Sequence, residues 1–96
     1  MTPAFTVSVT PQYECLCKKL LRTHRDLPVL QARMGEILAA DPYNLSRQHH
    51  IKKLEGIAQG DGQFRLSMGR WRFRYDTFGQ EVWLFYCGLR REETYS

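Results

Sequence analysis

The spacing of apolar residues changes along the chain and divides it into elements. Residues 5–9, FTVSV, alternate apolar and polar side chains, which is typical of a half-buried strand. Thr10 can then cap a helix that has Pro11 at its first position and extends to near His24. The apolar positions of this amphipathic helix are Tyr13, Leu16, Cys17, Leu20 and Leu21.

A second helix is predicted after a very short connection. Asp26 can cap it, Pro28 lies in its first turn, and Asp41-Pro42 stops it. Its apolar stripe consists of Leu30, Met34, Ile37 and Leu38. Because only residues 24–26 join the two helices, we expect them to form an antiparallel hairpin.

The second half of the chain predicts a long connection and three strands. Residues 42–62 are polar, with Leu54 and Ile57 as anchors, and strands follow at residues 64–68, 71–75 and 82–86. Gly69-Arg70 and Thr77-Phe78-Gly79 mark the turns between these strands. The element order predicts one α+β domain over residues 1–96, in which the N-terminal strand and helical hairpin pack on a mainly antiparallel four-stranded sheet.

Composition and cysteine spacing narrow the function classes. With 43% apolar and 12% aromatic residues, the chain can bury a core and is not disordered. It has no run of ~20 apolar residues and no signal-peptide pattern, so we expect a cytoplasmic protein without a membrane anchor. Cys15 and Cys17 form C-x-C, and Cys87 is distant, which favours reduced core cysteines over a zinc site. We expect no metal and no cofactor.

Positive charge is concentrated in one part of the chain. The net charge is +4, and all charges between Phe64 and Tyr75 are positive, namely Arg65, Arg70, Arg72 and Arg74. Side chains alternate between the two faces of a strand, so Arg65, Arg72 and Arg74 should share the face that the helices leave open. One of two alternating sets of the last strand would add an aromatic or apolar wall to this face, either Val82, Leu84 and Tyr86 or Trp83, Phe85 and Cys87.

Two interpretations of this basic face are possible. A solvated polar outer face is common in antiparallel sheets, and arginine stems cover apolar surface well. However, like charges directly opposite one another on paired strands are unfavourable, and an anion between them would relieve the repulsion. Arginine binds phosphate oxygens in a bidentate manner. The pattern therefore favours an anion-binding face over a solvated one.

An ordered set of short motifs runs through the C-terminal half. The set comprises Lys53-Leu54-Glu55-Gly56, Phe64-Arg65-Leu66, Gly69, Trp71-Arg72-Phe73-Arg74-Tyr75, Gly88-x-Arg90 and Tyr95. Together these residues resemble the RelE/ParE superfamily of bacterial toxins from toxin–antitoxin modules. The resemblance implies a RelE-like fold, in which the helix pair packs on a curved sheet and the functional groove lies on the concave face. It also implies a cognate antitoxin, often acidic, as the protein partner.

Members of this family act in two ways. RelE-like members cut mRNA, usually on the ribosome, whereas ParE-like members poison DNA gyrase and are not nucleases. By position, the resemblance assigns cleavage to Arg65, Arg72, Arg90 and Tyr95, and we favour the metal-independent endoribonuclease. Arginine stays protonated, so the Tyr95 phenol is the better candidate for proton transfer. The further residues expected to bind RNA are Lys52, Lys53, Arg70, Arg74 and Arg91.

Two departures from the family pattern leave alternatives open. Ser67 replaces a second outward lysine, and Leu89 stands where the family often has histidine or lysine before Arg90. The preceding connection contains four residues that could compensate for a missing proton-transfer group, namely His49, His50, Lys52 and Lys53. Alternatively, the chain is a gyrase inhibitor, or a binding module that holds RNA or a partner without cutting it.

Overall fold

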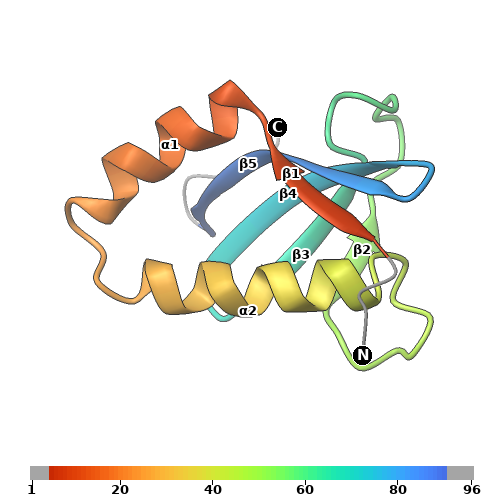
Figure 1. Ribbon diagram of the computed structural model, residues 1–96, viewed down its shortest axis with the longest axis horizontal. Helices are drawn as coiled ribbons and strands as arrows, with labels where there is room; N and C mark the ends of the chain where they lie inside the picture. Colours follow the sequence, from red (N-terminus) through yellow and green to blue (C-terminus); the bar gives the residue numbers. More distant parts are fainter. Residues whose placement is uncertain (1–4, 91–96) are drawn as a thin grey trace.

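A computed structural model describes residues 5–90, which form two helices and a five-stranded sheet. The elements in chain order are β1 (Thr6–Val9), α1 (Pro11–Leu21), α2 (Leu27–Ala40), β2 (Ile51–Lys53), β3 (Phe64–Met68), β4 (Trp71–Phe78) and β5 (Glu81–Leu89). Figure 1 shows α1 and α2 running in opposite directions on the same side of the sheet. The predicted α+β class and helical hairpin are confirmed.

The sheet has the strand order β1-β5-β4-β3-β2. β1 pairs with β5 in parallel, and the other three pairings are antiparallel. The prediction of four strands was wrong, because β2 pairs with β3 and forms one edge of the sheet. A three-residue strand is too short to show alternation in the sequence, and it is held in place by its partner strand.

The two helix starts are built differently. The Thr10 hydroxyl accepts a hydrogen bond from the Tyr13 backbone N–H at 3.2 Å, which confirms the predicted cap of α1. Asp26 precedes α2, but its side chain caps nothing there and instead accepts a hydrogen bond from Trp71 Nε1 at 2.9 Å. The predicted position of Asp26 at the N-cap is therefore confirmed, but its carboxylate binds the distant Trp71 indole and makes no capping hydrogen bond.

The core lies between the helices and one face of the sheet. Leu27 and Leu38 of α2 are fully buried with Phe73 of β4 and Leu84 of β5, and Trp71 is 1% exposed. Alternate residues of β4, namely Trp71, Phe73 and Tyr75, point into this core, as the alternation in the sequence predicted. The helices therefore cover one face of the sheet, and Arg65, Arg72 and Arg74 lie on the other.

The last hairpin is longer than the sequence predicted. β4 continues through Asp76 and Thr77 to Phe78, and the turn lies at Gly79-Gln80 rather than at residues 77–79. Gly79 has φ 61°, a left-handed conformation that suits glycine in a tight turn. The strand tolerates Asp76 because backbone N–H groups from another segment bind its carboxylate.

Candidate nucleic-acid interface

The face of the sheet opposite the helices carries cations in paired positions on three strands. Lys52 of β2 lies opposite Arg65 of β3, and Arg65 lies opposite Arg74 of β4. Arg74 in turn lies opposite Tyr86 of β5. We call Lys52, Arg65 and Arg74 the basic row. The predicted placement of Arg65, Arg72 and Arg74 away from the core is confirmed, because Leu66 and Phe73 between them are buried.

A second row of the same face runs next to the basic row. Ser67 pairs with Arg72, and Arg72 pairs with Gly88. Arg72 Nη1 donates to the backbone carbonyls of Gly69 and Trp71, both at 2.8 Å. Within residues 5–90 no carboxylate forms a salt bridge with Arg72. Its guanidinium is therefore held in position near the hairpin while its charge is not neutralised by an acid of this part of the chain.

Tyr86 contributes a phenol to the open face, a placement that the sequence left open because either alternating set of the last strand could face that way. A side chain at Gly88 would collide with the Tyr86 hydroxyl, so the phenol lies over Gly88. Because Gly88 is the register partner of Arg72, the Tyr86 ring spans both rows. The sequence did contain a signal, since a glycine two residues after an aromatic on one strand face makes room for that ring.

The loop between β2 and β3, residues 54–63, covers part of the open face, and we call it the glycine-rich loop because it contains Gly56, Gly60 and Gly62. The fully buried carboxylate of Asp76 accepts hydrogen bonds from the backbone N–H groups of Gly60, Gly62 and Gln63 at 2.6, 2.8 and 2.7 Å. Arg74 donates to the carbonyls of Asp61 and Gly62 at 3.0–3.1 Å. The guanidinium of Arg74 thus helps to fix the loop.

A cavity of about 570 Å³ opens next to the basic row. Three of its residues are cationic, and the full lining consists of Lys52, Lys53, Leu54, Glu55, Ile57 and Arg65. Lys53 was predicted to bind RNA, and the structure places it on this cavity together with Lys52. The anchors Leu54 and Ile57 are half-buried, as expected. Positive charge and a hollow surface therefore coincide at this edge of the sheet.

The end of the β3–β4 hairpin is separate from the basic row. Arg70 Nη2 lies 3.7 Å from Asp26 Oδ1, and its guanidinium lies 5.9 Å from the centre of the Trp71 ring. Arg90 follows β5, is exposed, and donates its backbone N–H to the Arg70 carbonyl at 2.7 Å. The structure thus places Arg90 beside the hairpin tip. Tyr95 and Arg91 lie outside the described residues.

The two histidines of the connection before β2 lie in another place. His49 and His50 line a groove of about 400 Å³ between α2 and β3, with Leu30 and Ile37 on its helix side. His49 Nε2 is 4.0 Å from Asp41 Oδ2. The idea that these histidines supply proton transfer on the basic row finds no support in this arrangement.

Two of the three cysteines belong to the core, as predicted, and Cys15 is exposed instead. The Cys17 sulfur accepts a hydrogen bond from Gln31 Nε2 at 3.0 Å. A hydrogen bond with Cys87 lowers the pKa of the Cys17 thiol to about 7, although burial opposes the shift. The same contact, together with burial, raises the pKa of Cys87. All three thiols are free.

Comparison with family models, with curated proteins and with solved structures gives no match to this chain. In residues 5–90, no helix has the length and apolar character that crossing a membrane requires. The same residues contain no group of three or more His, Cys, Asp or Glu side chains that could hold a metal ion.

Proposed function

We propose that this chain is the toxin of a toxin–antitoxin pair, has a RelE-like fold, and cleaves mRNA on the ribosome without a metal. The basic row is the observation that supports this proposal most directly. Lys52, Arg65 and Arg74 lie directly opposite one another on three adjacent strands. Like charges in such positions repel, and a phosphate chain lying across them would turn the repulsion into binding.

RNA cleavage on this face would follow the chemistry of the ribose. The 2′-hydroxyl oxygen attacks the neighbouring phosphorus after a base removes its proton, and the bond from phosphorus to the 5′-oxygen breaks. An acid protonates the departing 5′-oxygen, so the products carry a 2′,3′-cyclic phosphate and a 5′-hydroxyl. Arg65 and Arg72 supply fixed positive charge for the phosphoryl oxygens as negative charge grows on them.

Proton transfer needs a group that can change its charge, and arginine does not. The resemblance assigns this role to Tyr95. Tyr86 is a second phenol, and it lies on the open face over Gly88, opposite Arg74 and beside Arg72. Tyr95→Phe and Tyr86→Phe each remove one hydroxyl and keep the ring. The variant that loses cleavage while it retains RNA binding identifies the proton-transfer residue.

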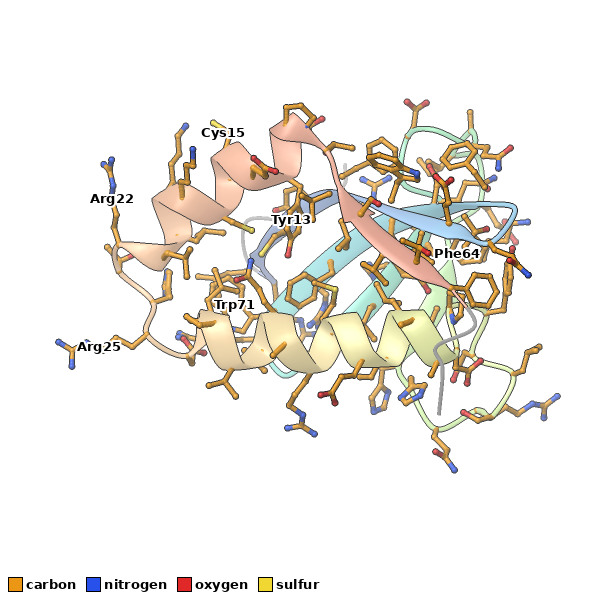
Figure 2. The ribbon with its side chains drawn as sticks, in the orientation of Figure 1. Tyr13, Cys15, Arg22, Arg25, Phe64 and Trp71 are labelled. Carbon is orange, nitrogen blue, oxygen red and sulfur yellow. The ribbon has the colours of Figure 1, made fainter. Side chains whose placement is uncertain are left out.

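The decisive test uses the purified full chain in three parallel reactions. These contain translating ribosomes with a defined mRNA, the same mRNA alone, and DNA gyrase with relaxed plasmid. We expect new mRNA ends on the ribosome and unchanged supercoiling. Arg72→Gln should slow cleavage by roughly 100-fold, as expected when one preorganised charge is removed from a transition state. Arg25→Gln is the matched control, because Arg25 is exposed and points away from the sheet in Figure 2.

The three reactions separate the proposed function from its alternatives. Loss of supercoiling without new RNA ends would identify a gyrase inhibitor. RNA binding that is sensitive to Arg72→Gln but yields no cleavage would identify a non-catalytic binding module. The proposed protein partner is an acidic antitoxin that covers the basic row. Added salt should weaken the association of the antitoxin with this chain, because salt screens the attraction between an acidic partner and a chain of net charge +4.

A further inference from the structure

A small cavity lies beside the basic row at the point where β5 is irregular. It has a volume of about 210 Å³, below the ~300–1,000 Å³ of sites that hold drug-sized ligands. Its lining combines two aromatic residues with polar groups from the glycine-rich loop and from the start of α1, namely Gln12, Gly60, Asp61, Arg74, Phe85 and Tyr86. The cavity is therefore of a size to suit one planar ring system.

A β-bulge brings the two aromatic residues to this cavity. Arg74 pairs with Tyr86, but the next residue, Tyr75, pairs with Leu84, so Phe85 has no partner on β4. Such a bulge redirects side chains, and bulges are common next to functional sites. Phe85 and Tyr86 are adjacent in sequence and would point to opposite faces of a regular strand, yet both line the same cavity and both are half-buried.

The polar residues of the cavity suit the edge of a base better than a phosphate. The Asp61 carboxylate is an acceptor only, and its charge repels phosphate. Guanine presents two adjacent donors, N1–H and the 2-amino group, which a carboxylate can accept together. The Gln12 amide adds one donor and one acceptor. Arg74 is fixed by its hydrogen bonds to the loop carbonyls, and a fixed guanidinium plane can stack on a base.

We propose that Phe85, Tyr86 and Asp61 form a nucleobase-binding pocket that holds one base of an RNA strand, preferably guanine, while its phosphates lie on the basic row. This inference rests on the proposed function, because it names a base preference for the same RNA-binding face. Aromatic side chains on a sheet surface bind single-stranded bases by stacking, and polar groups at the rim then choose among the bases. Phe85 and Tyr86 supply the stacking surface, and Asp61 determines which base is preferred.

The test measures binding of short 2′-O-methyl RNAs, which lack the 2′-hydroxyl and cannot be cleaved. Labelled UUGUU, UUAUU, UUCUU and UUUUU are titrated with the full chain at fixed salt, and fluorescence anisotropy gives each Kd. We expect UUGUU to bind about tenfold more tightly than UUUUU, the usual scale of one base contact. Phe85→Leu should abolish this difference, whereas Phe78→Leu, an exposed phenylalanine outside the cavity, should keep it.

A second variant keeps the inference testable if Phe85→Leu fails to fold. Asp61 is exposed, so Asp61→Asn should leave folding intact and shift the preference from guanine toward adenine, which an amide can pair through one donor and one acceptor. Equal Kd values for the four RNAs, no binding of any RNA, or a guanine preference unchanged by Asp61→Asn would each overturn the pocket. Guanine preference without mRNA cleavage on ribosomes would instead retain the pocket and reject the nuclease.

Discussion

The two faces of β4 differ in what holds their side chains. On the helix side, Trp71, Phe73 and Tyr75 are at most 1% exposed and pack against apolar residues of both helices. On the other side, Arg72 and Arg74 are half-buried and donate to backbone carbonyls. Alternate residues of β4 thus belong to the core, and the residues between them belong to the open face. Substitutions at neighbouring residues of β4 can therefore change stability and surface charge separately.

The largest expected effect is on the helix side. Phe73→Ala removes a fully buried ring and leaves a cavity, so the free energy of unfolding should fall by about 3–5 kcal/mol. Urea denaturation followed by circular dichroism measures the change. A loss below about 1 kcal/mol would mean that the helices do not pack tightly on this strand.

The next largest effect is expected at Asp76, whose carboxylate holds the glycine-rich loop on the open face through hydrogen bonds. Asp76→Ala leaves three backbone N–H groups without their carboxylate and should lower the free energy of unfolding by about 2–3 kcal/mol. Amide hydrogen exchange at Gly60, Gly62 and Gln63 should accelerate more than exchange in β4. Asp76→Asn keeps one acceptor oxygen and serves as the milder comparison. Uniform acceleration in both segments would show that the loop and the sheet open together.

A smaller effect depends on pH and concerns the connection after α2. The Ser46 hydroxyl, followed by the backbone N–H groups of Ser46 and Leu45, lowers the pKa of Asp41 against the effect of burial. The resulting stability is complete above the ordinary carboxyl pKa of about 4, and it is lost as the pH falls through the lower folded pKa. The Tm of the wild type should therefore fall more steeply below pH 4 than that of Asp41→Asn. Parallel curves would contradict this linkage.

The smallest expected effect on stability is at Arg72. Arg72→Gln should change the free energy of unfolding by less than about 0.5 kcal/mol, because the guanidinium is only partly buried and donates to nearby carbonyls. The same variant should reduce the salt dependence of RNA binding by about one phosphate contact. A large stability loss at Arg72 would remove the contrast with Phe73.

The sequence predicted most of the fold because its elements carry their own periodic patterns. The helices and the β3–β4 hairpin follow from residues that repeat at helical or strand spacing, and Gly69-Arg70 marks the turn. The short strand β2 could not be predicted, because its three residues depend on pairing with β3. The length of the last hairpin was also missed, since the buried Asp76 is satisfied by a loop that is distant in sequence.

The candidate site was predicted in part. Alternation along the strands placed Arg65, Arg72 and Arg74 correctly on the open face, because this depends only on local geometry. Alternation could not reveal that Arg74 binds the loop carbonyls or that Arg70 approaches Asp26, since both contacts join distant segments. The bulge that brings Phe85 and Tyr86 together also has no signature in a single sequence.

The parallel pairing of β1 with β5 has a consequence for how the protein is made. Residues 6–9 pair with residues 81–84, and β5 lies between β1 and β4 in the sheet. Among the strands of residues 5–90, β5 is synthesised after the others and has to insert between β1 and the β3–β4 hairpin, a non-local step that comes late in folding. During translation neither the core nor the open face is complete. Any activity that the open face carries can therefore begin only after residues 81–84 have paired with residues 6–9.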